Sequence, residues 1–171
     1  MDSRQIQQIL LAKTFTKSDY LRRVTYIREF LEGRFFKNNK GNFSDYLLQV
    51  KVSTHDREAI SGLDEHFFNL FTKDNLYPVI NSLVEELKPL PVLTLYLAVI
   101  VEDYLVDELG IWFRKNLHPE LIMEVRCNPT LVSGCAYVWN NQYRDLSLHY
   151  FFKKREDLIN KIIESYVHEQ L

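Results

Sequence analysis

The sequence is poor in the residues that build common small-molecule sites. It holds only five glycines among 171 residues, and they are scattered along the chain. A dinucleotide-binding fingerprint and a Walker-type phosphate loop each need several glycines within a few positions, so neither occurs here in its usual form. We therefore expect that the chain by itself binds no nucleotide and needs no cofactor.

Cysteine is also scarce. The chain has two, Cys127 and Cys135, and no Cys-x-x-Cys or His-x-x-x-His spacing accompanies them. A structural zinc site needs about four ligands, and two of these are missing. A pair of cysteines fits a reducing compartment better than a disulfide-built fold. We predict no metal site and interpret both cysteines as small buried apolar side chains.

Excess charge and long apolar runs are lacking as well. The 21 basic and 23 acidic side chains give a formal net charge of −2, which provides no general attraction to nucleic acid. No apolar run approaches the roughly 18 to 20 residues that cross a bilayer, and no signal-peptide core follows the first residues. The hydrophobic content of 46% is still enough for sizeable cores. We expect a soluble globular protein with no nucleic-acid partner and no direct membrane insertion.

The first 88 residues have the pattern of helices. Apolar residues recur every three or four positions in five segments separated by short polar connections. Each apolar stripe needs a partner, which favours an antiparallel bundle. The second helix is expected to run from Ser18 to a cap at Gly33, and the fourth from His55 to Phe71 after a capping box formed by Ser53 and Asp56. The other three helices begin at Ser3, at Phe43 and after a cap at Asp74.

The segment Lys88-Pro-Leu-Pro91 is the best domain boundary, because two prolines prevent a helix from running through it. The apolar run 92–101 then predicts a strand covered on both faces, and 121–126 predicts another. Between them we expect a helix after Asp103. Strand, helix and strand in this order indicate a parallel pair. The side chains expected to face inward on this helix are Leu105, Leu109, Trp112 and Phe113.

A hairpin and a long helix are predicted to complete the chain. Asn128-Pro129 ends the preceding strand, 131–139 is rich in β-formers, and Asn140-Asn141 can supply a type I′ turn to a returning strand at 142–144. Asp145 or Ser147 then caps a helix from Leu148 to about residue 170. A helix of this length spans roughly 30 Å or more, longer than a small sheet requires. We therefore expect its outer half to contact a partner. The sequence thus predicts an α+β fold, with an all-α bundle over residues 1–88 and a small mixed α/β domain over 92–171.

Asp145, Ser147 and His149 contain the residue types of a hydrolase triad, but their order is wrong. In an extended segment they would stand nearly 7 Å apart on one face, with the histidine at the end of the row. A triad needs the histidine between acid and nucleophile. We interpret Asp145 and Ser147 as helix-capping residues and predict no catalytic residue.

The C-terminal half resembles a known family. Pro129-Thr-Leu-Val-Ser-Gly134 followed by Asp145-Leu-Ser-Leu148 is similar to the Pro-Ser-Leu-Ile-Gly-Gly … Asp-x-Ser-Leu signature of the delta subunit of F-type ATP synthase, also called the oligomycin sensitivity conferral protein. The similarity in order and spacing extends from about Pro91 to Ile163, and it departs at Ser133, where the family has glycine. That family usually has six N-terminal helices. The matching motif positions are Pro129, Leu131, Gly134, Asp145, Ser147 and Leu148.

The resemblance implies a non-catalytic stator subunit of a proton- or sodium-driven ATP synthase. In that family the N-terminal domain binds N-terminal helices of the head's alpha subunits, and the C-terminal domain holds the b subunits of the peripheral stalk. The lack of a transit-peptide pattern further favours a bacterial version, a peripheral protein on the cytoplasmic side of the inner membrane. A free-standing helical adaptor and a small α/β enzyme with an unrecognised site remain as alternatives.

Two surfaces are expected to carry the partner contacts. In the N-terminal region, the first helix and the phenylalanine-rich stripe of the fourth should form a groove for a partner helix. In the C-terminal region, the last turns of the final helix should help dock the stalk. The residues predicted to bind partners are Ile6, Leu10, Phe67, Phe68, Phe71, Ile163, Tyr166 and Val167.

Overall fold

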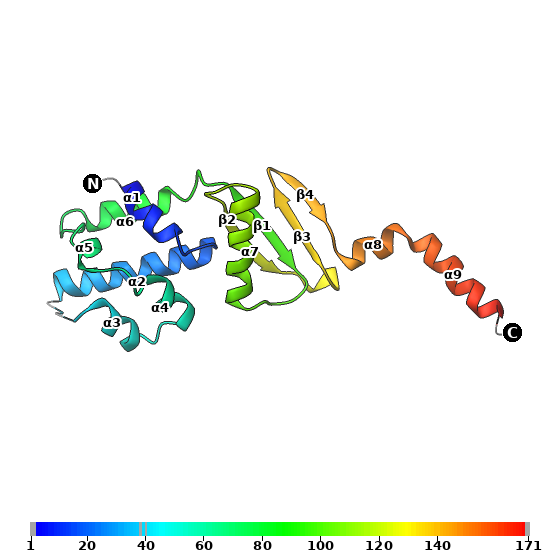
Figure 1. Cartoon of the computed structure of the whole chain (residues 1–171), viewed down its shortest axis with the longest axis horizontal. Coiled ribbons are helices and arrows are strands. Elements are labelled where there is room, and N and C mark those ends of the chain that lie inside the picture. The colour runs from blue at the N-terminus through cyan, green and yellow to red at the C-terminus, as the bar shows by residue number, and fades with distance from the viewer. Residues whose placement is uncertain (1–2, 38, 40, 170–171) are drawn as a thin grey trace. The chain divides into compact units, whose positions relative to one another are not determined.

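The computed structural model describes residues 3–37, 39 and 41–169, with side chains described up to Ser165. This part of the chain has an α+β fold of nine α-helices and a four-stranded mixed sheet (Figure 1). Contacts group the chain into two units. The first unit contains Met1–Val92 and Glu102–Met123, and the second contains Leu93–Val101 and Glu124–Leu171. The segment 102–123, which we had assigned to the C-terminal domain, therefore packs with the N-terminal helices.

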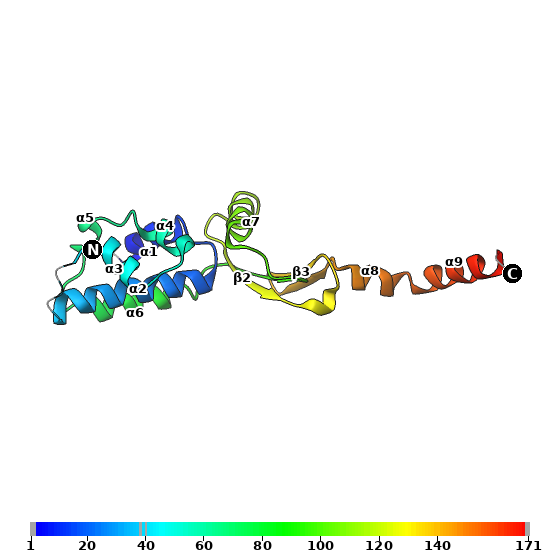
Figure 2. The same cartoon turned by 90° about the horizontal axis from the view of Figure 1, so that it is seen from below.

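Six helices occur before residue 89 in the described part of the first unit. Helix α6 packs against both α1 and α2. Figure 1 shows it beside α1, and Figure 2 shows it along α2. Their inward side chains form one apolar core, centred on fully buried residues such as Tyr20, Ile27 and Leu47. The helices are α1 (Ser3–Leu11), α2 (Lys17–Phe36), α3 (Phe43–Gln49), α4 (Thr54–Ile60), α5 (Glu65–Phe68) and α6 (Leu76–Glu85).

The predicted fourth helix is in fact two helices. Helix α4 ends at Ile60, and the chain turns at Gly62 before α5 begins after the cap Asp64. The Asp64 carboxylate accepts from the Phe67 N–H at 3.0 Å, which satisfies a donor at the new helix start. The continuous apolar pattern concealed this break, and the prediction of five helices was one too few.

The bounds of α2 also differ from the prediction. Its N-cap is Thr16, whose hydroxyl accepts from the Asp19 N–H, and not Ser18. Gly33 does not end the helix, which continues for another turn to Phe36. This extra turn is held by packing, because the Phe36 ring stacks on Tyr77 of α6 with an interplanar angle of 13°.

Helix α7 (Asp103–Asn116) buries a different face from the one expected. Its buried residues are Val106 and Gly110, whereas Leu105 and Trp112 are exposed. Gly110 allows close approach to Phe15: a Cβ at that position would lie 2.4 Å from the Phe15 Cβ. A small residue, and not a large apolar one, therefore forms the contact.

Arg114 fastens the end of α7 to the rest of the first unit. Its guanidinium donates to the carbonyl oxygens of Leu11, Thr14 and Leu121 at 2.6, 2.7 and 2.9 Å, and lies 4.6 Å from the centre of the Phe15 ring. Burial lowers the pKa of Arg114. Three carbonyl acceptors and one aromatic face thus hold this cation without a carboxylate partner.

The sheet has the strand order β2-β1-β3-β4. Strand β1 (Val92–Leu97) pairs antiparallel with β3 (Cys135–Trp139), and β3 pairs antiparallel with β4 (Gln142–Asp145). The sheet is mixed, so β1 and β2 (Ile122–Cys127) form the predicted parallel pair. Strand β1 is shorter than predicted, because the chain bends after Leu97 and leaves Val99 and Ile100 exposed.

The predicted hairpin turn is confirmed. Asn140 and Asn141 have φ of 50° and 60°, and the two positive values are those that a type I′ turn requires. The strand before it is shorter than expected, since Pro129–Leu131 forms a 3-10 turn, η1, and β3 begins only at Cys135.

The predicted long C-terminal helix is interrupted. Helix α8 (Leu148–Lys154) ends at Arg155, and α9 (Glu156–Glu169) follows it directly. In both views α8 and α9 follow one another away from the β3–β4 hairpin (Figures 1 and 2). Across the described residues, no helix has both the length and the apolar character needed to span a bilayer.

Candidate functional site

The two halves of the family-like motif meet in the second unit. The Leu148 N–H donates to the Ser133 carbonyl at 2.9 Å, and the Leu146 N–H donates to the Cys135 carbonyl at 2.9 Å. Leu131 and Ser147 are buried at this junction, and η1 contacts α8. The motif therefore forms a brace that fixes where α8 leaves the hairpin.

Gly134 makes this close approach possible. Its φ is +83°, and a Cβ there would lie 2.7 Å from the Leu146 carbonyl oxygen. Both the backbone conformation and the contact exclude a larger side chain. The neighbouring position, Ser133, carries a side chain that is exposed, so the family's first glycine is not required for this geometry.

Replacing Gly134 by alanine is expected to destabilise the second unit by about 2 to 4 kcal/mol, because left-handed strain and a steric clash add. Thermal unfolding monitored by circular dichroism measures this loss. Ser133→Ala is the matched control and should change stability by less than about 0.5 kcal/mol. Equal stability of the two variants would contradict the brace.

The turn beside Gly134 is strained. Val132 has φ 66° and ψ −53°, and the Ser133 N–H donates to the Leu131 carbonyl two residues earlier. This is a γ-turn of the rare kind, which is unfavourable for a β-branched residue. The Val132 side chain is exposed. Such strain is often kept at functional positions, which makes Val132 a candidate contact residue.

Ser147 is the cap of α8, as the sequence allowed. Its hydroxyl accepts from the Tyr150 N–H at 3.1 Å. Asp145 instead accepts from the Ser147 N–H at 2.9 Å, and hydrogen bonds from Ser147 hold the pKa of Asp145 below its usual range. Both residues thus serve the start of the helix.

Helices α8 and α9 expose seven large apolar side chains to solvent. These side chains stand before and after the break at Arg155, and the basic residues Lys153, Lys154 and Arg155 separate the two groups in sequence. At the break, an open hollow of about 580 Å³ is lined by His149, Phe152, Lys153, Glu156 and Ile159. The exposed apolar side chains, which we call the C-terminal apolar face, are Leu148, Tyr150, Phe151, Phe152, Leu158, Ile162 and Ile163.

Of the predicted stalk contacts, Ile163 belongs to this face and is 56% exposed. The side chains of Tyr166 and Val167 lie outside the described residues.

The predicted N-terminal groove is filled by the protein's own helices. Ile6, Leu10, Phe67, Phe68 and Phe71 all belong to the core of the first unit, and none is more than 5% exposed. The Phe67 and Phe68 rings pack edge to face with centroids 5.2 Å apart. The stripe looked too wide for a small core, but its aromatic rings pack against one another and against Phe30 and Phe43. A partner helix therefore cannot pack against these side chains in the folded unit.

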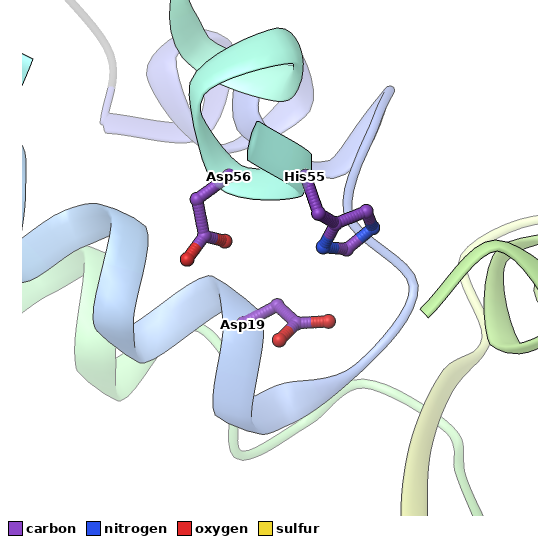
Figure 3. Close-up of side chains that lie close together, drawn as sticks. All are labelled: Asp19, His55 and Asp56. Atoms are coloured by element: carbon purple, nitrogen blue, oxygen red, sulfur yellow. The ribbon is translucent and has the colours of Figure 1, made fainter. Parts of the chain in front are cut away.

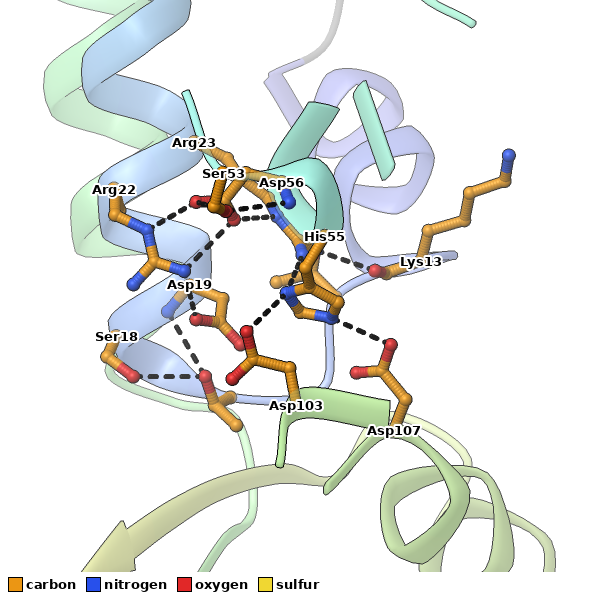
Figure 4. A network of polar contacts seen from close by, with 12 residues as sticks. Lys13, Ser18, Asp19, Arg22, Arg23, Ser53, His55, Asp56, Asp103 and Asp107 are labelled. Carbon is orange, nitrogen blue, oxygen red and sulfur yellow. Dashed lines mark hydrogen bonds and ion pairs between the residues drawn. The ribbon is translucent and has the colours of Figure 1, made fainter. Parts of the chain in front are cut away.

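The first unit contains a network of charged residues that was not predicted from the sequence. Asp56 of α4 accepts from Arg22 Nε at 2.5 Å and from Arg23 Nε at 2.9 Å (Figure 4). Burial raises the pKa of Asp56, but hydrogen bonds and charges from the two arginines outweigh it and lower that pKa. Arg22 also bonds Asp19 at 2.6 Å. The two carboxylates share one position that indicates their role: Asp19 and Asp56 are each the third residue of a helix after its N-cap.

His55 extends this network to α7. Its Nε2 lies 2.8 Å from Asp107 Oδ2, and its Nδ1 lies 3.3 Å from Arg23 Nη2 and 3.6 Å from Asp103 Oδ2 (Figure 4). The side chains come from α2, α4 and α7, so the network joins three elements of the first unit.

Asp19, His55 and Asp56 also bring three possible metal-ligating atoms within 4.8 Å (Figure 3). The arginines argue against an ion there. Both oxygens of Asp56 accept from guanidinium groups, and Arg23, only 1% exposed, also approaches His55 Nδ1. A divalent cation would have to displace the guanidinium groups of the buried Arg23 and the partly exposed Arg22, which already neutralise these ligands. We interpret the cluster as structural.

The cysteines differ from the prediction. Cys127 is exposed and Cys135 is half-buried, and both are free thiols. Cys127 comes at the end of β2, beyond the covered part of the strand.

No model of a known protein family matches the chain, and no curated protein matches it.

Proposed function

We propose that the protein is the stator subunit that links the catalytic head of an F-type ATP synthase to the b subunits of its peripheral stalk. In this role it supports ion-coupled ATP synthesis without catalysing a reaction itself. The first unit, with α1–α6 as the family's six-helix bundle, binds the alpha subunits, and the second unit binds the stalk. The protein is then a peripheral component on the cytoplasmic side of a bacterial membrane.

The brace formed by Pro129–Gly134 and Asp145–Leu148 carries the proposal. The resemblance concerns residues that are distant in sequence, and here they join in one junction through Leu148 and Ser133. Gly134 is the motif residue with the strictest steric requirement. This geometry fixes the position at which α8 begins relative to the hairpin. A fixed helix position suits a subunit that resists torque.

The C-terminal apolar face supports the stalk contact. Seven large apolar side chains in two short helices are between 39% and 56% exposed. Such a concentration on a helix is typical of helix-to-helix recognition. The head contact needs a surface of the first unit other than the buried phenylalanine stripe.

Replacing Phe152 by glutamate should weaken binding of the stalk b subunits by at least about tenfold, because a buried apolar contact is exchanged for a desolvated charge. Calorimetric titration of the full-length protein with the b subunits encoded by the same genome measures this change. Circular dichroism should stay unchanged, since Phe152 is 54% exposed.

Ile100→Glu is the matched control, since Ile100 is an apolar residue of the same unit that is 87% exposed and lies outside α8 and α9. It should bind as tightly as the unchanged protein. If the unchanged protein does not bind b subunits at all, the stator proposal fails and the adaptor hypothesis is favoured. If Phe152→Glu and Ile100→Glu bind equally well, the contact surface lies elsewhere.

A further inference from the structure

The imidazole of His55 has more partners than its two nitrogens can serve at once. It stands in the first turn of α4 and faces Asp107 and Asp103 of α7 on one side and Arg23 of α2 on the other (Figure 4). The side chain is 18% exposed, so solvent protons reach it.

Hydrogen counting fixes the state of Nε2. The Asp107 carboxylate, 2.8 Å away, can only accept a hydrogen bond. Nε2 therefore carries a hydrogen whether the ring is neutral or charged. The tautomer of neutral His55 follows: its second nitrogen, Nδ1, has a free lone pair.

The two neighbours of Nδ1 make opposite demands. Arg23 Nη2, at 3.3 Å, only donates and needs that lone pair. Asp103 Oδ2, at 3.6 Å, only accepts and needs a proton on Nδ1. The first contact exists for neutral His55 and the second for protonated His55, so the two exclude each other.

The surroundings carry a surplus of negative charge. Four carboxylates of the network face two guanidinium groups, and the nearby hollow of about 430 Å³ is lined by one further acid and one further base. A proton on His55 offsets part of this surplus. The charged groups around His55 are Asp19, Arg22 and Arg23 of α2, Asp56 and Glu58 of α4, Asp103 and Asp107 of α7, and Lys13.

We propose that His55 is a proton-operated clamp between α4 and α7. Neutral His55 connects Arg23 to Asp107. Protonated His55 releases Arg23 and pairs with Asp103 and Asp107 together. Protonation of His55 therefore tightens the hold on the start of α7.

The clamp acts at the start of α7, where the chain returns to the first unit after residues 93–101. Asp103 is the first residue of α7 and follows Glu102, at which this segment of the unit begins. The amides of Leu105 and Val106 both bond to the Glu102 carbonyl. These two amides therefore report directly on whether the first turn of α7 is held.

The test uses the full-length protein labelled with nitrogen-15. Over an acid titration, imidazole resonances should show hydrogen only on Nε2 of His55 while its ring is neutral and on both nitrogens once the ring is charged. Hydrogen-exchange protection factors of Leu105 and Val106, corrected for intrinsic exchange, should rise by roughly two- to fivefold over the same titration, the range of a partly exposed ion pair.

His55→Gln and Asp103→Asn should abolish this rise, whereas His66→Gln, an exposed histidine of α5, should keep it. Asp103 is 63% exposed, so its substitution is expected to leave the fold intact. The proposal is overturned if neutral His55 carries its hydrogen on Nδ1, or if either clamp variant retains the full rise in protection.

Discussion

Replacing Asp56 by asparagine is expected to lower the free energy of unfolding at pH 7 by about 3 to 5 kcal/mol, the cost of leaving a buried charge without its partner. Arg23 and Asp56 are each only 1% exposed, and their side chains meet at 2.9 Å. The asparagine keeps the shape but removes the negative charge that compensates Arg23. Urea unfolding followed by tryptophan fluorescence measures the loss.

The pH dependence of this loss has a defined sign. The arginines hold the pKa of Asp56 in the folded protein below its usual value. The stabilisation is therefore complete above the unfolded pKa, about 3.9, and disappears as pH falls through the lower folded value. The difference between the unchanged protein and Asp56→Asn should be constant from pH 7 to about pH 5 and shrink below about pH 4.

Glu65→Gln is the matched control. Arg34 and Glu65 also form an ion pair at 2.9 Å, but both side chains are considerably exposed, so the loss should be no more than about 1 kcal/mol. If Asp56→Asn costs as little as Glu65→Gln, the buried network does not stabilise the first unit.

Gly110→Ala should destabilise the first unit by about 2 to 4 kcal/mol, because the new methyl group would lie 2.4 to 2.7 Å from atoms near the base of the Phe15 side chain. Those atoms cannot rotate away, so α7 must move. Thermal unfolding detects the loss.

Gly62→Ala is the control, since a methyl group there meets nothing within 4 Å, and it should be neutral or slightly stabilising. In a Phe15→Gly background, Gly110→Ala should lose most of its effect. Full destabilisation in that background would mean that α7 does not pack on Phe15.

Local chemistry made part of the fold predictable. The Asn140-Asn141 turn and the Ser147 cap depend on residues next to one another in the chain, and both were found from sequence. The strand, helix and strand after Pro91 followed from the change in apolar period. These features need no knowledge of distant residues.

The rest depended on contacts that sequence patterns do not display. The Arg23–Asp56 pair joins residues 33 positions apart, and the buried face of α7 is marked by a glycine, which carries no apolar signal. The phenylalanine stripe at 67–71 indicated burial correctly but not that its partners lie within the same unit. No proline or glycine marks the break at Arg155, where α8 ends and α9 begins.

Purification of the ATP synthase from native membranes through a tag on its catalytic beta subunit tests the central claim most directly. Quantitative mass spectrometry should find this chain in the intact enzyme together with the b subunits of the stalk. An intact, coupled synthase that contains a different delta subunit and none of this chain would contradict the stator assignment.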